Sequence, residues 1–467
     1  MTESKNQIPY KKISTYYLFG TLFNQGIAFL TVPIFTRLLG TSDYGIITTY
    51  NSWVAILLMV VSCAVYMGIR AAFIDFEDTI DDVMSSMTTF TLANGLLCTV
   101  LVLIIAKIVH FQYPEYLVLL CMIQSIGGGL LQNYSMYLMM QYKYRQRTFF
   151  LVAPNLIAVL ASICVIAFVL KTDLYLGRIV PTAITQGVFG AIVVCLVYKK
   201  SKRLFIAKYV KYALAISLPL VLHGIALNIL SQSDRLMITW LRNSSETGIY
   251  SLVYNFSMIA TVITTALDGV WVPWFTNKLK GQCVEDINRR VKDYIEIITV
   301  AMMGLILVGP EIVKILAGKD YWDGIRIIPP IVAANYAIFG YTLYVNVEHF
   351  YKKTVYITWN TIIAAAVNIV TNYIFIPKYG YVAAAFTTLF SYLIAFVLHA
   401  RYAKKLNKEL YPLIHFLVPF LKLFAAVVVF YLLLDQLLLR WGIACLVCVI
   451  ELVQNRASIK EFLSKRA

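Results

Sequence analysis

Apolar runs of about 20 residues recur along the whole chain, and they constrain its fold more than any motif does. A run of that length, wound as an α-helix, spans the hydrocarbon core of a membrane. Only 14% of the residues are charged and 60% are hydrophobic, whereas a soluble domain carries about 25% charged residues. The sequence therefore predicts an all-α polytopic membrane protein with about fourteen transmembrane helices.

The predicted helices follow one another with short connections, and no loop is long enough to hold a soluble domain. The segment 201–215 alternates basic and apolar residues, which is typical of a helix at the membrane interface, and it joins two halves of the chain. The predicted spans are 13–36, 44–69, 83–106, 115–139, 148–170, 177–198, 216–241, 247–272, 291–309, 325–346, 355–376, 381–400, 412–434 and 438–453.

The basic residues are concentrated in loops that share one side of the membrane. The chain has 40 Lys and Arg against 24 Asp and Glu, a formal net charge of +16. In a soluble protein this excess would suggest a nucleic-acid partner, but here it collects on the side of both termini, as at Lys199, Lys200 and Lys208. The positive-inside rule predicts that both termini are cytoplasmic, and no nucleic-acid partner is expected.

The two halves of the sequence resemble each other at a nearly constant offset. The segment RLLGTSDYGIITTYN matches WLRNSSETGIYSLVYN, which places Gly45 opposite Gly248, 203 positions later. The same offset places Gly177 opposite Gly380. Parallel repeats of this kind are typical of transporters, whose substrate site lies between the halves near the bilayer midplane. We therefore predict a six-helix lobe at 1–200, a second six-helix lobe at 201–405, and two additional C-terminal helices at 406–467.

Three segments of the chain resemble a known family. They read VPIFTRLLGTSDYGI, SQSDRLMITWL followed by TGIYSLVYN, and IPKYGYVAAAFTTLFSY. These segments are similar to the polysaccharide-exporter branch of the multidrug/oligosaccharidyl-lipid/polysaccharide (MOP) flippase superfamily, the bacterial flippases of O-antigen, capsule and related repeat units. The resemblance extends over essentially the whole chain.

The resemblance implies a MATE-like fold, with two lobes around a central cavity, and transport by alternating access. It also implies the cargo, an oligosaccharide on an undecaprenyl diphosphate carrier, which moves from the cytoplasmic to the outer leaflet of the bacterial cell membrane. The implied partners, besides membrane lipid, are a polysaccharide polymerase and chain-length machinery. Composition and spacing do not themselves identify this cargo.

Polar residues in the seventh predicted helix are the first candidates for the substrate site. A charged side chain inside the bilayer costs about 2.5–3.5 kcal/mol on insertion scales, so such residues are functional candidates. One helix face carries polar residues at i, i+3, i+4 and i+7, namely Asn228, Ser231, Gln232 and Arg235. The planar fork of an arginine matches phosphate oxygens. Alternatively, Asp234 and Arg235 form a structural pair that locks the helix to a neighbour.

Further polar residues are candidates for the cavity lining, namely Asn24, Gln25, Asn51, Asn255, Arg37 and Arg70. The amides among them could instead join helices by hydrogen bonds. Both arginines lie near predicted helix ends, where snorkelling to the interface is the alternative.

A coupling ion, H⁺ or Na⁺, needs a titratable or anionic group inside the membrane. The candidates for this role are Asp234, His223 and Asp268. Lys422 lies too deep in its helix for easy snorkelling, and we expect it to contact a lipid phosphate or to pair with an acid. No cofactor and no metal site is predicted, since Cys445 and Cys448 have no His or Cys partner nearby in the sequence.

Three functions fit a chain of this kind: a lipid-linked oligosaccharide flippase, an ion-coupled exporter of organic cations, and a membrane polysaccharide polymerase or ligase. In or next to the predicted spans, the basic candidates Arg37, Arg70, Arg235 and Lys422 outnumber the acidic candidates Asp234 and Asp268, which favours an anionic cargo over a cation. The HExxH, GxSxG and P-loop patterns of enzymes are absent from the sequence. The sequence therefore predicts a flippase rather than an enzyme.

Overall fold

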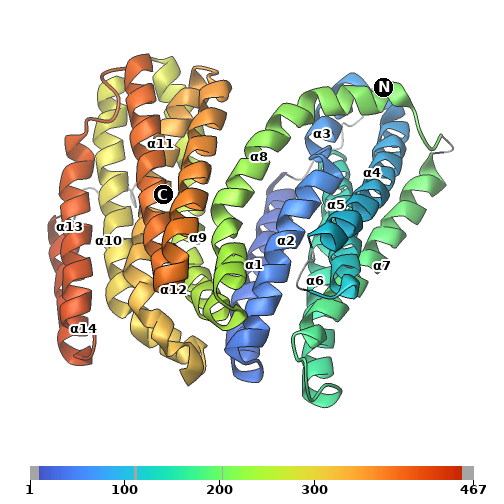
Figure 1. Cartoon of the computed structure of the whole chain (residues 1–467). Coiled ribbons are helices and arrows are strands. Elements are labelled where there is room, and N and C mark those ends of the chain that lie inside the picture. The colour runs from blue at the N-terminus through green and yellow to red at the C-terminus, as the bar shows by residue number, and fades with distance from the viewer. Residues whose placement is uncertain (1–9, 110–112, 202, 455–467) are drawn as a thin grey trace. The chain divides into compact units, whose positions relative to one another are not determined.

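The described structure is built from helices (Figure 1). The computed structural model describes residues 10–109, 113–201 and 203–454, and it has no strand in these ranges. In this part of the chain, ten helices are long and apolar enough to cross a membrane, which confirms the prediction of an all-α polytopic membrane protein.

The α-helices are α1 (Tyr10–Leu38), α2 (Thr41–Ser62), α3 (Tyr66–Asp75), α4 (Ile80–Ile108), α5 (Glu115–Met140), α6 (Tyr144–Phe168), α7 (Leu176–Lys200), α8 (Ala207–Leu241), α9 (Ser244–Lys280), α10 (Val284–Leu316), α11 (Ile328–Phe350), α12 (Thr354–Leu406), α13 (Ile414–Leu432) and α14 (Leu437–Gln454). The two 3₁₀ segments are η1 (Glu77–Thr79) and η2 (Lys319–Ile327).

The helices are broken at two places, of which one differs from the predicted spans and the other agrees with them. The span predicted at 44–69 is divided into α2 and α3, because Cys63 and Ala64 have φ angles of 44° and 47°, which no right-handed helix allows. The spans predicted at 355–376 and 381–400 correspond to the two parts of α12, which meet at a kink at Gly380 (φ 63°, ψ −150°). Glycine adopts such a positive φ without steric strain, so this residue permits the kink.

The chain forms two compact units, Met1–Ile229 and Leu230–Ala467, with their boundary inside α8. Because α8 begins at Ala207, most of the predicted interfacial segment 201–215 makes the first turns of this 35-residue helix. The division between lobes at 200/201, which rests on the sequence repeat, stays a prediction.

The first turns of α8 pack within the N-terminal unit. The hydroxyl groups of Tyr209 and Thr79 are hydrogen-bonded at 2.9 Å. The backbone N–H of Ile206, just before α8, donates to Ser86 Oγ of α4 at 3.0 Å. These bonds connect the beginning of α8 to η1 and to α4.

Glycines bring α5 and α7 into close contact in the N-terminal unit. A Cβ atom on Gly127 would lie 2.3 Å from the carbonyl oxygen of Gln186, and a Cβ atom on Gly190 would lie 2.8 Å from Gly127 Cα. Small residues let membrane helices approach closely, which strengthens van der Waals packing where lipid supplies no hydrophobic driving force.

Ion pairs attach the two C-terminal helices to α10. Lys422 Nζ of α13 lies 2.8 Å from Glu296 Oε2, so the structure supplies an acidic partner for this deep lysine. Arg440 of α14 pairs with Glu311, whose second oxygen accepts a hydrogen bond from Trp441 Nε1 at 3.1 Å. Buried charges need such partners, and here the pairs also specify which helix α13 and α14 pack against.

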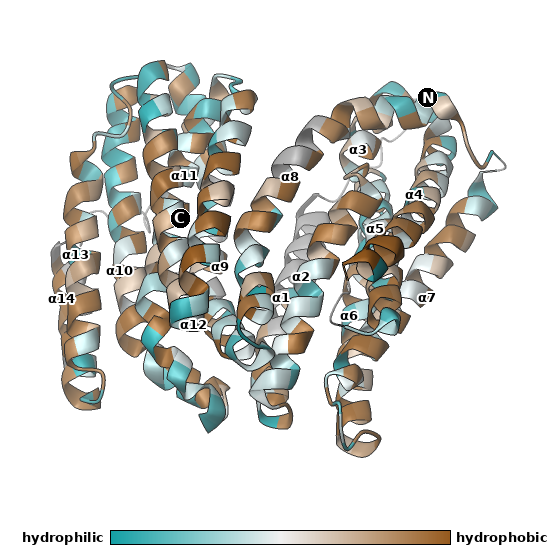
Figure 2. Cartoon of the chain, viewed as in Figure 1, coloured by the Kyte–Doolittle hydropathy of each residue, from teal (hydrophilic) through white to brown (hydrophobic). Residues whose placement is uncertain are grey.

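Hydrophobic residues, coloured brown, recur along the helices (Figure 2). On α4, for example, Leu96, Leu97, Ile104 and Ile105 are all exposed. Apolar patches of this extent are rare on soluble monomers, whereas lipid chains cover them without cost. The chain is a multi-pass membrane protein.

Candidate functional site

Asp234 of α8 is fully buried, and its carboxylate accepts four hydrogen bonds. Its Oδ2 accepts from Tyr250 Oη of α9 and from Thr388 Oγ1 of α12, each at 2.6 Å. Its Oδ1 accepts from two amides of α12, Asn372 at 2.7 Å and Asn368 at 3.2 Å. These charge-assisted bonds compensate the buried charge and tie α8 to α9 and α12.

A second layer of polar groups holds the two asparagines. Ser233 Oγ donates to Asn368 Oδ1 at 2.8 Å, Asn372 Nδ2 donates to the same oxygen at 3.1 Å, and Thr387 Oγ1 donates to Asn372 Oδ1. We call Asp234, these residues, Tyr250 and Thr388 the Asp234 cluster. Carboxylate, amide and hydroxyl oxygens are the ligands that hard cations prefer. The described residues contain no group of three or more His, Cys, Asp or Glu that could hold a metal ion.

Arg235 of α8 is also buried, with 6% of its surface exposed, but it makes different contacts. Its Nη1 donates to Gln232 Oε1 at 2.8 Å and to the Ser231 carbonyl oxygen at 3.1 Å. Its guanidinium carbon lies 4.5 Å from the centroid of the Tyr254 ring of α9, a cation–π contact. Asp234 and Arg235 form no ion pair in the described structure, because neighbouring positions on a helix point about 100° apart.

The four polar residues predicted to share one face of α8 therefore do not all contact the same group. Arg235 donates hydrogen bonds to Gln232 and to the carbonyl oxygen of Ser231, whereas the Asn228 amide donates to the Gly224 carbonyl of its own helix at 3.0 Å.

The candidates of the N-terminal unit have two kinds of environment. Asn24 of α1 accepts a hydrogen bond from Asn155 Nδ2 of α6 at 2.9 Å, so this amide joins two helices. The side chains of Asn51, Arg37 and Arg70 are exposed.

Of the remaining candidates, Asn255 of α9 is half-buried, and Asp268 of α9 accepts a hydrogen bond from Tyr294 Oη of α10 at 3.2 Å. The side chains of Gln25 and His223 lie outside the described part of the structure.

Sequence reasoning missed the partners of Asp234 on α9 and α12. A signal was present for two of them, because Asn368 and Asn372 stand at i and i+4 inside the apolar run AAAVNIVTNYIF. The argument that selected the polar face of α8 applies equally to this pair. Tyr250 and Thr388 carry no such signal, since single hydroxyl groups are common in membrane helices.

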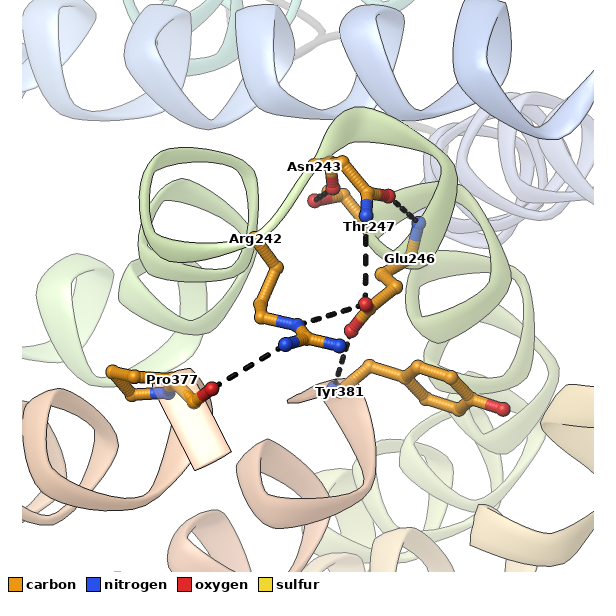
Figure 3. A network of polar contacts seen from close by, with 6 residues as sticks. All are labelled: Arg242, Asn243, Glu246, Thr247, Pro377 and Tyr381. Carbon is orange, nitrogen blue, oxygen red and sulfur yellow. Dashed lines mark hydrogen bonds and ion pairs between the residues drawn. The ribbon is translucent and has the colours of Figure 1, made fainter. Parts of the chain in front are cut away.

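The turn between α8 and α9 holds the kink of α12 through a polar network (Figure 3). Arg242 Nε donates to Glu246 Oε1 at 2.9 Å, and its Nη1 donates to the Pro377 carbonyl oxygen at 3.3 Å. Glu246 Oε2 accepts from the backbone N–H of Tyr381 at 3.0 Å. Asn243 caps α9 by accepting from the Glu246 N–H at 2.8 Å. The network connects the element that carries Asp234 with the one that carries its amide partners.

Solved structures share this fold. The lipid II flippase MurJ in an inward closed conformation aligns with a TM-score of 0.69 at 15% sequence identity, over 96% of this chain and 99% of that chain. An inward-facing multidrug resistance MATE family transporter of the MOP superfamily aligns with a TM-score of 0.60 at 11% identity, over 82% of this chain and 96% of that chain. The predicted MATE-like fold is confirmed.

The chain is also similar in sequence to known proteins. A protein of Haemophilus influenzae known as an uncharacterized membrane protein is 22% identical over 389 residues, covering 78% of this chain and 92% of the relative. The model of the family described as "Polysaccharide biosynthesis protein" matches residues 11–278, more than half of the chain. With this match over α1 to α9, the chain belongs to the polysaccharide biosynthesis protein family.

Proposed function

We propose that this protein is a flippase that moves lipid-linked oligosaccharides from the cytoplasmic to the outer leaflet of a bacterial cell membrane by alternating access. Membership of the polysaccharide biosynthesis family and the fold shared with a lipid II flippase support this function. The proposed cargo is a repeat unit of O-antigen, capsule or another surface polysaccharide on undecaprenyl diphosphate. Polysaccharide polymerase and chain-length machinery are the proposed partners.

The buried guanidinium of Arg235 is the observation that carries the proposal. Both of its hydrogen bonds use Nη1, so the edge formed by Nε and Nη2 donates to no described residue. That edge offers two parallel N–H groups, which is the geometry that binds two oxygens of a phosphate. The Tyr254 ring holds the plane of the guanidinium from one side. Arg235 is thus suited to bind the diphosphate of the carrier.

We assign ion coupling to Asp234. Its carboxylate is surrounded by groups that can donate or accept, since hydroxyls rotate and the oxygen and nitrogen of an amide exchange places on a flip. Asp234, Asn368, Asn372 and Thr388 can therefore present oxygens to Na⁺, or Asp234 can accept a proton. Either event removes the net charge of the cluster and so shifts the balance between conformations of the C-terminal unit.

The runner-up function is an ion-coupled exporter of organic cations. It is favoured by the buried carboxylate of Asp234 and by the fold shared with a MATE transporter. Against it, four donors already compensate this carboxylate, while the nearby Arg235 would repel a cationic cargo. A membrane polymerase or ligase is disfavoured, because the solved structures that share this fold are a flippase and a transporter.

A flipping assay in proteoliposomes tests the proposal. Vesicles with the purified protein should translocate an undecaprenyl-diphosphate oligosaccharide, and Arg235→Ala should abolish translocation without loss of insertion. Arg289→Ala is the matched control, since this side chain of the same unit is 81% exposed. Translocation of an organic cation but not of the lipid-linked sugar would replace the flippase by the exporter. Full activity of Arg235→Ala would remove the diphosphate role from that residue.

A further inference from the structure

A second buried acid, Glu348, lies in the C-terminal unit and has no part in the function proposed above. Glu348 of α11 and His399 of α12 are both fully buried, and His399 Nδ1 lies 2.9 Å from Glu348 Oε2. The pair joins the last turns of α11 to the last turns of α12, 51 positions apart in the chain.

Half of the polar atoms in this pair lack a hydrogen-bond partner. Glu348 Oε1 and His399 Nε2 are buried and unpartnered among the described residues. Asp234 differs in this respect, because neutral donors on both of its oxygens stabilise the anion. A carboxylate with a single bond and no cation beside it would be costly in an apolar interior.

The neighbouring titratable groups do not supply the missing charge. The ring of Tyr341 in α11 stacks on His399 with ring centroids 5.5 Å apart. Tyr341 also interacts electrostatically with Tyr254 of α9. His349, the next residue after Glu348, and Tyr402 of α12 both interact electrostatically with the Glu348 carboxylate. Among the described residues, the imidazole of His399 is the only group that forms an ion pair with Glu348.

We propose that Glu348 and His399 form a buried proton-binding site. The pair takes up one proton from water, which converts a carboxylate and a neutral imidazole into a carboxylate and an imidazolium with the shared proton between Oε2 and Nδ1. The net charge of the site then changes from minus one to zero. The closed packing of α11 on α12 holds the proton, and it returns to water when these helix ends separate.

Proton binding by this pair does not depend on the cargo, and only its link to transport rests on the proposed function. In the flippase, uptake of the proton would favour the closed arrangement of α11 and α12, and its release would accompany opening. Ion coupling at Asp234 is a separate event, since that cluster involves α8, α9 and other positions of α12.

Nitrogen-15 NMR of the histidines in purified protein in lipid nanodiscs, without cargo, tests the site. The chain has five histidines, and His399→Gln assigns the resonance of interest. At neutral pH the wild type should show His399 as an imidazolium, and Glu348→Gln should convert it to the neutral ring. His349→Gln is the control, because it removes an exposed neighbouring imidazole and should leave the His399 signal unchanged.

A neutral His399 ring in the wild type, or an imidazolium that persists in Glu348→Gln, would overturn the proposal. If Glu348→Gln does not fold, the wild type still decides. Its His399 must be an imidazolium in the folded protein at neutral pH. Failure of the flipping assay alongside an imidazolium at His399 would reject the flippase and leave the proton site in place.

Discussion

Glu246 accepts a hydrogen bond from the backbone N–H of Tyr381 at 3.0 Å, directly beside Gly380 at the kink of α12. In the N-terminal unit Asp43, which occupies the same position of the sequence repeat, accepts one from the backbone N–H of Tyr175 at 3.3 Å, at the start of α7. Each acid lies in the first turn of its own helix, α9 or α2. The two contacts are alike in kind, although Tyr175 and Tyr381 stand 206 positions apart rather than 203, and the repeat itself stays a prediction.

Gly380→Ala should lower the thermal unfolding midpoint of the detergent-solubilised protein. The conformation of Gly380 (φ 63°, ψ −150°) is one that only glycine adopts readily, and it costs another residue about 1–3 kcal/mol. A Cβ atom at this position would also lie 2.3 Å from Glu246 Oε2. Gly304→Ala is the control, since a Cβ atom on this glycine of α10 meets nothing within 4 Å. Equal midpoints for the two variants would show that the kink is not held by the network around Glu246.

Asp234→Asn should remove the ion dependence of transport. The substitution keeps the shape of the side chain but replaces a charged acceptor by an amide, which turns an N–H donor toward groups that themselves donate. We expect a loss of about 1–3 kcal/mol in the free energy of unfolding as well. Transport rates measured over a range of Na⁺ concentrations and pH values check the first effect.

The control for this experiment is Asp320→Asn, because Asp320 is an exposed acid of the same unit. If the Asp234 variant keeps the Na⁺ and pH dependence of the wild type, the coupling ion binds elsewhere.

The helices could be predicted from the sequence because the requirement that creates them is local. A span needs about 20 consecutive apolar residues. Runs such as LCTVLVLIIA therefore predict α4 without any information on the helices that pack against it. The break between α2 and α3 could not be predicted, since Cys63 and Ala64 adopt positive φ without a glycine to announce it.

The candidate site was predicted only where its residues share one helix. Asp234 and Arg235 stand out as charges in an apolar run, and they were found. Asn368 and Thr388 approach Asp234 from 134 and 154 positions away. Such contacts depend on how α12 packs on α8, which one sequence does not determine. Glu348 and His399 were missed for the same reason.

Lys422 and Glu296 should show energetic coupling in a double-mutant cycle. Lys422→Met leaves the Glu296 carboxylate unpaired between α13 and α10, and Glu296→Gln does the reverse. Each single variant should therefore be less stable than the double variant, with a coupling energy of about 0.5–3 kcal/mol. Unfolding followed by a probe on α13 measures it. Additive effects would mean that lipid headgroups, rather than Glu296, stabilise the lysine.

The orientation can be tested with single cysteines in a background without the native ones. We expect a membrane-impermeant thiol reagent to label Lys171→Cys in intact cells and to label Lys353→Cys only after the membrane is opened. Both positions are exposed in loops. The basic loops predict that Lys353 lies on the cytoplasmic side, together with the termini, and that Lys171 lies on the outer side. Labelling of Lys353→Cys from outside would reverse the topology.

Arg235→Lys should restore only part of the transport lost in Arg235→Ala. Loss of a charge-assisted hydrogen bond costs about 1.5–3 kcal/mol, or roughly a tenfold to hundredfold decrease in the affinity for cargo. Lysine keeps the positive charge but has no planar fork, so it cannot lie flat on Tyr254, bond Gln232 and grip a phosphate at the same time. Initial translocation rates at low cargo concentration should rank wild type above lysine above alanine. A lysine variant as fast as the wild type would mean that charge alone suffices, and that the guanidinium does not bind the diphosphate in the bidentate manner proposed.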